Sequence, residues 1–189
     1  MLTTICLIRH GETDWNKEGR LQGREDIELN EAGKLQAAKC AEYLSRSHWD
    51  EVVSSPLKRA LQTAKIIKNR LNLYEIQEVY SFIERDYGEG SGLTKEERDA
   101  RFPDGVVAGV EDNNTLAERT MNAMIDIVES YRGKRVIIIS HGSAINSILA
   151  SITKNQIGTG KTVLKNGCIS FIQHDGYDWE ILKYNPSAE

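Results

Sequence analysis

The hydrophobic pattern of the first half of the chain predicts alternating strands and helices. "TTICLIRH" (residues 3–10) is a short apolar run without polar alternation, which is typical of a buried central strand. Asn30 then precedes "EAGKLQAAKCAEYLS" and is placed to cap a helix there. Four apolar residues recur in that helix at helical spacing: Leu35, Ala38, Ala41 and Leu44.

The next two elements repeat this order. "DEVVSS" (50–55) reads as a second strand, and Pro56 opens a second helix over "PLKRALQTAKIIKNRLNL", since proline at the first helical position loses no hydrogen bond. Alternation of strands and helices favours a sheet of parallel strands joined by right-handed crossovers.

The pattern weakens between Tyr74 and Val110, where we expect an irregular excursion over the sheet edge. A capping box from Thr94 to Glu97 predicts one short helix inside it.

The remaining third returns to regular patterns. A capping box from Thr115 to Glu118 is expected to open the long helix "LAERTMNAMIDIVESYR". "KRVIIISHG" then reads as a buried strand and "SAINSILASIT" as a helix. The tail "GCISFIQHDGYDWEILKYN" (167–185) reads as two strands around an Asp-Gly turn, a hairpin at the sheet edge that could pair with a second copy in a homodimer.

Composition narrows the class of protein. The chain has 189 residues, 40% of them hydrophobic and 28% charged, so we expect residues 1–189 to form a single globular domain. A net charge of -4 argues against nucleic acid or a membrane surface as partner. Without a recognisable leader or a long apolar segment, we expect a cytoplasmic protein. The three cysteines sit in apolar patterns and are expected to be buried thiols: Cys6, Cys40 and Cys168.

Two of the predicted strands end in the same way, with a histidine followed by glycine. One ends at Arg9-His10 and the other at Ser140-His141-Gly142. Because the carboxyl ends of parallel strands form the ligand crevice, both histidines are expected to face one pocket. The glycines after them let a ligand approach the backbone closely.

The neighbouring residues indicate what ligand that pocket takes. Arg9, and Arg59 at the start of the second helix, carry planar guanidinium groups suited to phosphate oxygens. Amides after Gly142 would add donors at a helix N-terminus. The alternative is structural: two packed histidines and a solvated helix arginine.

Taken together, the motifs of this chain resemble those of the histidine phosphatase superfamily. The resemblance rests on "LIRHGETDWN", "LQGREDIELNEAGKLQA", "SSPLKRALQTA" and "SHG", in that order between residues 4 and 144. It implies a three-layer α/β/α sandwich around a mostly parallel sheet, with the hairpin as an antiparallel edge. It also implies a phosphohistidine mechanism on a small phosphomonoester, without metal or another cofactor.

The resemblance implies roles for individual residues, according to their positions in the matching motifs. His10 would be the nucleophile, and its second ring nitrogen needs an acceptor such as a backbone carbonyl to fix the tautomer. Arg9, Arg59 and His141 would hold the phosphoryl oxygens. The residues expected to line the pocket beside them are Asn16, Gln22, Gly23 and Gly142.

The family also uses a carboxylate from the middle of the chain for proton transfer. Glu84 in "FIERDYGEGSG" fits that role, and Asp86 and Glu89 are competitors in the same segment. Glu12 matches the first motif but is not assigned the proton transfer.

Three activities fit these residues. The short, acidic segment after Glu84 favours a hydrolase, whereas "ERDYG" echoes the phosphoglycerate mutase branch. A non-catalytic binding module is the third possibility. Four residues could contact the rest of a substrate or form surface salt bridges instead: Arg85, Tyr87, Arg98 and Arg101.

Some features point away from the main interpretation. "IGTGKT" (157–162) lacks the first glycine of a nucleotide-binding loop, because Asn155 stands there. Thr115 completes a glycosylation motif but is assigned to the helix cap. His48 and His174 lie in polar, turn-like stretches and are expected on the surface.

Overall fold

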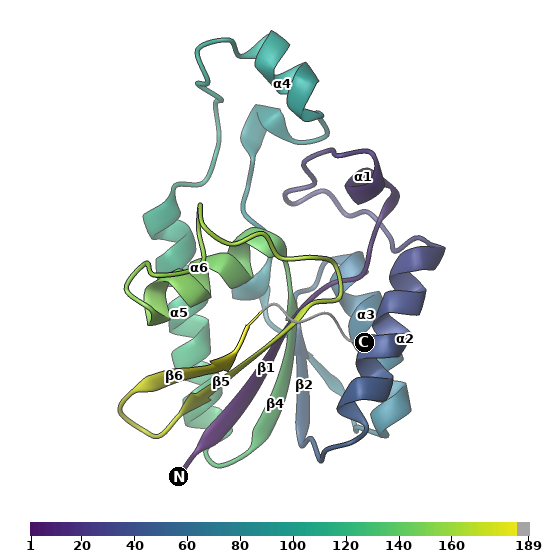
Figure 1. Ribbon diagram of the computed structural model, residues 1–189, viewed down its shortest axis with the longest axis vertical. Helices are drawn as coiled ribbons and strands as arrows, with labels where there is room; N and C mark the ends of the chain where they lie inside the picture. The colour runs from purple at the N-terminus through teal and green to yellow at the C-terminus, as the bar shows by residue number, and fades with distance from the viewer. Residues whose placement is uncertain (185–189) are drawn as a thin grey trace.

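The computed structural model describes residues 1–184, so the last residue of the predicted tail, 185, lies outside it. Its centre is one six-stranded sheet in the order β3-β2-β4-β1-β5-β6 (Figure 1). The strands are β1 (Thr3–Arg9), β2 (Glu51–Ser54), β3 (Ile76–Glu78), β4 (Arg135–Ser140), β5 (Ile169–His174) and β6 (Trp179–Lys183). β1 to β4 run parallel, and β5 and β6 are antiparallel. The mostly parallel sheet with an antiparallel edge is therefore confirmed.

Helices cover both faces of this sheet. α2 (Glu31–Leu44) and α3 (Lys58–Leu71) lie on one face, and α5 (Asn113–Ser130) and α6 (Gly142–Ile152) lie on the other (Figure 1). Short helices occupy the connections: α1 (Asp14–Lys17), η1 (Tyr80–Phe82), η2 (Gly88–Gly90) and α4 (Lys95–Arg101). The predicted three-layer α/β/α sandwich is therefore confirmed.

Alternating side chains of β1 hold the three layers together. Ile5 and Leu7 belong to the apolar cluster under α5 and α6, while Cys6 and Ile8 belong to the cluster under α2 and α3. A strand buried on both faces needs a continuous apolar run, which is why "ICLI" shows no polar alternation. Each fully buried aliphatic side chain stabilises the fold by about 1.5–3 kcal/mol relative to exposure. Cys6, Cys40 and Cys168 are buried free thiols, as expected.

The buried face of α2 differs from the prediction. Leu35 is 66% exposed and Ala38 is exposed too, whereas Ala41 and Leu44 are buried. The helix packs through small residues instead, with Gly33, Ala37 and Cys40 on its inner face. A Cβ atom on Gly33 would lie 2.1 Å from the carbonyl oxygen of Glu12, so backbone-to-backbone contact, not side-chain size, sets the face. Asn30 caps this helix as predicted, accepting the Gly33 N–H.

Two helix starts were predicted wrongly. Asp112, not Thr115, caps α5, and it accepts the N–H groups of Asn114 and Thr115. Thr115 therefore lies inside the first turn. Helix α3 begins at Lys58 after Leu57, two residues beyond Pro56. The capping box from Thr94 to Glu97 is present at α4.

The mid-chain excursion projects beyond the carboxyl end of the sheet, where α1 also lies (Figure 1). Its stem is an antiparallel bridge between Tyr87 and Val110. The excursion is tied to the loop after α1, because Gly92 N–H donates to the Leu21 carbonyl at 2.7 Å and Leu21 N–H donates to the Leu93 carbonyl at 3.1 Å. Two loops far apart in sequence thus form one wall above the strand ends. The short strand β3 and the helix α1 were not predicted.

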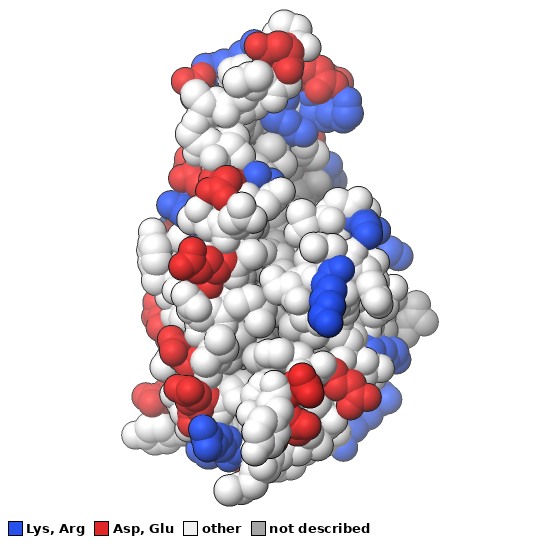
Figure 2. Space-filling model, turned by 90° about the vertical axis from the view of Figure 1, so that its left-hand side faces the viewer, with Lys and Arg blue, Asp and Glu red and all other residues white. Residues whose placement is uncertain are grey.

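The surface carries both signs of charge. On the side formed by α5 and α6, acidic and basic side chains are interspersed (Figure 2).

His48 is exposed, as predicted, but His174 is half-buried and its ring centroid lies 4.5 Å from that of Trp179. His174 therefore lies at the surface but is partly covered, because the β5–β6 hairpin brings its ring against that of Trp179. No helix in the described part of the chain is long and apolar enough to cross a membrane.

Candidate active site

His10 and His141 meet at the carboxyl ends of β1 and β4. These two strands are paired in parallel, with Arg9 opposite Ser140, so the residue that follows each strand emerges at the same edge. Both rings are buried and their centroids are 5.1 Å apart. The sequence prediction that the two histidines face one site is consistent with this geometry.

The hydrogen bonds of His10 define its tautomer. Nδ1 lies 2.7 Å from the Gly11 carbonyl oxygen, which can only accept, so Nδ1 carries the proton. Nε2 then keeps its lone pair and accepts a hydrogen bond from Arg59 Nε at 3.2 Å. Burial, and after it the charges of Arg59 and Arg9, lower the pKa of His10 well below its usual range. The ring is a neutral base at pH 7.

His141 is held through its other ring nitrogen. Its Nε2 lies 2.7 Å from Ser55 Oγ at the end of β2. Burial and then the charge of Arg59 lower the pKa of His141 well below its usual range, so this ring is neutral too. Because a serine hydroxyl can donate or accept, this contact fixes the position of the ring and not its tautomer. The buried Nδ1 has no hydrogen-bond partner among the described residues.

Arg59 is fully buried at the start of α3, which is unusual for a helix arginine. Two backbone carbonyls fix its guanidinium: Nη1 donates to Glu25 at 2.6 Å and Nη2 donates to Gly23 at 2.8 Å. Burial lowers the pKa of Arg59 to about 10, and the group still carries its charge at pH 7. A fixed cation therefore lies against His10 Nε2.

Arg9 supplies the second cation. Its Nη1 donates to the Leu164 carbonyl at 2.5 Å. Its Nε is buried without a hydrogen-bond partner among the described residues. Burial lowers the pKa of Arg9, and the charge of Glu84 opposes that effect. Gly142 packs against this group, because a Cβ atom placed on it would lie 3.5 Å from Arg9 Nε.

Glu84 lies at the N-terminus of α6, directly beside the residues that follow His141. Its Oε1 accepts the N–H groups of Arg85 at 2.8 Å and Ala144 at 3.1 Å, and its Oε2 accepts the N–H of Ser143 at 3.1 Å. The amides after Gly142 were expected to face a phosphate. Those of Ser143 and Ala144 donate to this carboxylate instead, since a helix N-terminus stabilises any nearby anion.

The competing carboxylates point elsewhere. Asp86 accepts the Gly88 N–H at 2.8 Å within its own turn, and Glu89 lies 3.5 Å from Arg101 on α4. Both side chains are at least one-third exposed, whereas Glu84 is 8% exposed. Glu84 is thus the buried carboxylate of this segment.

The loop around α1 brings Asn16, Gln22 and Gly23 to the same end of the sheet. Thr13 connects the first two, since its hydroxyl lies 3.1 Å from Asn16 Oδ1 and 3.0 Å from Gln22 Oε1. Gly23 has φ +52°, a left-handed conformation that favours glycine, and its carbonyl orients Arg59. Gly23 therefore contributes to the site by positioning Arg59 through its backbone carbonyl.

Several residues of this region were not predicted. Asn166 Nδ2 donates to the His10 carbonyl and to Asn16 Oδ1, both at 3.1 Å. Thr63 Oγ1 accepts the Gly11 N–H at 3.1 Å and donates to the Arg59 carbonyl at 2.8 Å. Ser55, in contact with His141, is part of the quoted motif "SSPLKRALQTA" and could have been found from it. Asn166 offered no comparable signal.

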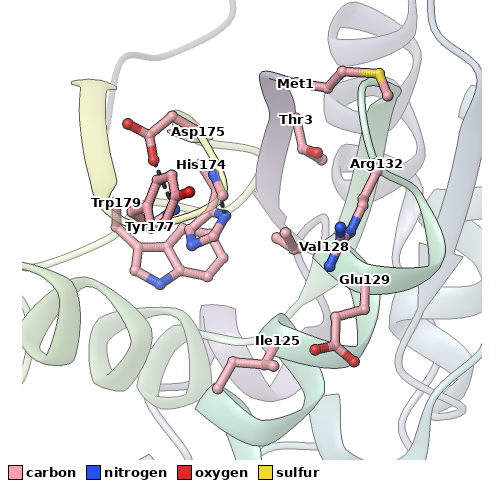
Figure 3. Close-up of a pocket in the computed structure, with 11 residues that line it drawn as sticks. Met1, Thr3, Ile125, Val128, Glu129, Arg132, His174, Asp175, Tyr177 and Trp179 are labelled. Carbon is pink, nitrogen blue, oxygen red and sulfur yellow. Dashed lines mark hydrogen bonds between the residues drawn. The ribbon is translucent and has the colours of Figure 1, made fainter.

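A separate cavity of about 410 Å³ lies at the opposite end of β1 (Figure 3). Met1 and Thr3 line it on one side, and His174, Tyr177 and Trp179 of the hairpin line it on the other (Figure 3). It includes none of the predicted site residues. In the described part of the chain, no group of three or more histidine, cysteine, aspartate or glutamate side chains is arranged to hold a metal ion.

Comparison with known proteins agrees with the geometry. Residues 5–187 match the family model described as "Histidine phosphatase superfamily (branch 1)". A relative in Bacillus subtilis, named as the uncharacterized phosphatase PhoE, is 41% identical over 184 residues, which cover 97% of this chain and 95% of the relative. A metal-independent phosphoserine phosphatase of Arabidopsis thaliana is 35% identical over 193 residues, covering 95% of this chain and 80% of the relative.

A solved structure is similar over the whole fold. A phosphoserine phosphatase of Entamoeba histolytica, a mutant in complex with phosphoserine, superposes with a TM-score of 0.85 and 26% identity, covering 98% of each chain. Fold and relatives together define a phosphoric monoester hydrolase. The chain belongs to the histidine phosphatase superfamily, branch 1.

Proposed function

We propose that this phosphatase hydrolyses small phosphomonoesters through a phosphohistidine formed on His10 Nε2, without a metal ion. The observation that carries the proposal is the orientation of the His10 ring, with Nδ1 held by the Gly11 carbonyl and Nε2 facing Arg59. Fixing one nitrogen of an imidazole leaves the other as a directed nucleophile. The name of the Arabidopsis relative supports metal independence.

In the first step, Arg59 Nε–H gives up its hydrogen bond to His10 Nε2 and turns to a phosphoryl oxygen. The freed lone pair of Nε2 attacks phosphorus, and the bond from phosphorus to the ester oxygen breaks. The electron pair of that bond goes to the leaving oxygen, which takes a proton and departs as an alcohol. The phosphoryl group passes from oxygen to nitrogen, so one difficult displacement by water is divided into two easier ones.

Charge that develops on the transferring oxygens needs fixed donors. Among the described residues, Arg9 Nε and His141 Nδ1 are buried nitrogens without hydrogen-bond partners. The His141 ring lies 5.1 Å from that of His10, and the charge of Arg9 acts on His10. In the tautomer with hydrogen on Nδ1, both nitrogens can donate to the phosphoryl oxygens. Arg59 supplies a third donor against Nε2. Preorganised donors of this kind lower the barrier to phosphoryl transfer because they need no reorganisation during the reaction.

In the proposed mechanism, Glu84 donates the proton to the leaving oxygen. Its Oε1 already accepts two N–H groups, whereas Oε2 accepts one and has room to carry the proton. Oε2 also lies 3.8 Å from the Cβ position of Gly142, on the side of Arg9. In the second step, the Glu84 carboxylate takes a proton from water, the water oxygen attacks phosphorus, and the bond to Nε2 breaks to release inorganic phosphate.

A mutase would have to hold a second anionic group of a bisphosphorylated intermediate. The candidate arginines of the mid-chain segment are all engaged within the protein. Arg85 donates to the Glu111 carbonyl, Arg98 donates to the Leu93 carbonyl, and Arg101 lies near Glu89. These contacts favour the hydrolase.

The substrate class is a small phosphorylated metabolite. Similar proteins act on phosphoserine, as the names of the Arabidopsis and Entamoeba enzymes state, and a similar mycobacterial structure is named as a glucosyl-3-phosphoglycerate phosphatase. Phosphoserine and 3-phosphoglycerate are therefore the first substrates to test.

Phosphorus NMR of the purified protein in EDTA tests the proposal. The substrates are phosphoserine and 3-phosphoglycerate, the latter with a trace of 2,3-bisphosphoglycerate. We expect inorganic phosphate to appear without metal and to be absent with His10→Ala. Formation of 2-phosphoglycerate at constant total ester would overturn the hydrolase and establish a mutase.

A further inference from the structure

We infer that Arg119 of α5 is a positioning residue that holds Glu84 in place for proton transfer. This inference rests on the proposed function of Glu84. Arg119 lies 35 residues away from Glu84 in sequence and outside every motif that predicted the site.

The Arg119 guanidinium binds the backbone of the segment that carries Glu84. Nη1 donates to the carbonyl oxygens of Ser81 at 2.7 Å and Ile83 at 2.9 Å. Nη2 donates to the carbonyl of Glu84 itself at 3.1 Å. One side chain thus fixes three carbonyls within four residues.

This segment has no other regular support. Helix η1 ends at Phe82 and the antiparallel bridge of the excursion begins at Tyr87, so Glu84 lies between them outside any helix or strand. The Phe82 carbonyl accepts the hydroxyl of Ser140 at 2.8 Å. All four carbonyls from residue 81 to residue 84 therefore receive side-chain donors, and Arg119 provides three of these contacts.

Glu111 fixes the guanidinium in turn. Its carboxylate accepts Arg119 Nε at 2.6 Å and Nη2 at 2.9 Å, a bidentate pair in which the Glu111 side chain is 6% exposed. Burial opposes ionisation of Glu111, but the hydrogen bond and charge of Arg119 hold its pKa below the usual value. A planar guanidinium that makes five hydrogen bonds through Nε, Nη1 and Nη2 has one orientation, which lysine cannot reproduce.

The carboxyl end of Glu84 is held separately by α6, through the N–H groups of Ser143 and Ala144. Arg119 fixes the main chain from α5 and α6 fixes the carboxylate. Displacement of the main chain would move Oε2 away from the leaving oxygen without changing the nucleophile, since Arg119 makes no hydrogen bond to His10 or Arg59. Loss of Arg119 should therefore resemble loss of the proton donor.

The leaving group distinguishes this role from simple stabilisation. An alkyl phosphate such as phosphoserine needs its leaving oxygen protonated, whereas dinitrophenyl phosphate expels a stable anion and does not. We measure kcat/KM, which reports only the steps through phosphorylation of His10, for both substrates. The variants are Arg119→Lys, Arg119→Gln, Glu111→Gln and Glu84→Gln. Arg135→Lys is the control, since Arg135 also donates to a backbone carbonyl, that of His48, at the end of the sheet opposite His10 and His141.

We expect Glu84→Gln to lose roughly 10²-fold or more on phosphoserine and less than about tenfold on dinitrophenyl phosphate. Arg119→Lys and Arg119→Gln should show the same selectivity, with a loss of about tenfold to 10²-fold on phosphoserine. Glu111→Gln keeps the shape of the side chain but removes its charge, so the same selectivity should appear more weakly. This variant tests the inference if the Arg119 variants do not fold. Equal losses on both substrates, or a lowered melting temperature alone, would overturn the positioning role. No selectivity in Glu84→Gln would instead refute the proton donor itself, and with it the inference.

Discussion

Arg59 Nε lies 3.2 Å from His10 Nε2, so a buried cation directly faces the lone pair of a neutral imidazole. The same cation is tied to two loop carbonyls, those of Gly23 and Glu25. Burial of the His10 ring and, after it, the charge of Arg59 lower the pKa of His10, which favours the neutral ring that the proposed nucleophile requires. The N-terminal loop, the first histidine and α3 are joined at this one guanidinium.

Replacing Arg59 should reduce catalysis strongly. We expect Arg59→Lys to lower kcat/KM about 10²-fold to 10³-fold, because a single fixed donor to a developing oxyanion has this effect in other enzymes. Initial rates of phosphate release measure it. Lys58→Gln is the matched control on the neighbouring exposed residue, and an equal loss in both variants would show that Arg59 acts only through the stability of α3.

The nucleophile can be tested without loss of the fold. His10→Ala should reduce phosphate release by at least about 10³-fold. Circular dichroism should show a folded protein, since the apolar clusters on both faces of the sheet do not include His10. Full activity in this variant would contradict the assignment of His10.

Stability should depend on pH through the two buried histidines. The folded-state pKa values of His10 and His141 are both depressed, so the unfolded chain binds more protons below about pH 6.5. The free energy of unfolding is therefore highest above that pH and falls as the pH decreases. The slope contributed by each histidine rises from near zero above about pH 7.5 toward a limit of about 1.4 kcal/mol per pH unit as the pH falls below about 6.5.

Urea titrations between about pH 7.5 and pH 5.5 measure this slope. Replacing His141 by asparagine should remove about half of it, whereas His48→Gln, at an exposed position, should leave it unchanged. A stability that does not vary over this range would mean that the two rings titrate normally in the folded protein.

Much of the site was predictable because its residues lie next to strand ends. Arg9, His10 and His141 follow apolar runs that could only be buried strands, and topology alone brings them to one edge. Arg59 was proposed from its guanidinium group and gained weight from the motif around it, and Glu84 came from the family resemblance. Their exact partners did not, because hydrogen bonds such as Asn166 to the His10 carbonyl join residues 156 positions apart.

The errors in the fold have a common origin. The apolar spacing of Leu35, Ala38, Ala41 and Leu44 matches the buried face of α2 only at Ala41 and Leu44, because α2 approaches the chain after His10 so closely that only Gly33 fits there. Thr115 was expected as a cap, whereas Asp112 lies closer to the true helix start and accepts two N–H groups. Backbone approach and competition among capping residues are three-dimensional properties that a linear pattern does not contain.

Close packing at Gly33 provides a further test. Alanine is normally favoured over glycine inside a helix by about 1 kcal/mol. Here we expect Gly33→Ala to destabilise the protein by about 1–3 kcal/mol, since the added Cβ atom would overlap the Glu12 backbone. Urea unfolding measures the change, with Lys34→Ala on the exposed side of the same helix as control. A more stable Gly33→Ala variant would show that the loop after His10 can move aside.

The central claim is that the reaction passes through a phosphoryl group on Nε2 of His10. The most direct test is rapid mixing with radiolabelled phosphomonoester in EDTA, quenching in base, and mapping of the label to a residue and ring nitrogen. We predict a transient, acid-labile phosphohistidine at His10 with phosphorus on Nε2, absent from His10→Ala. Turnover without a phosphoenzyme, or label on Nδ1 or on another residue, would contradict the account.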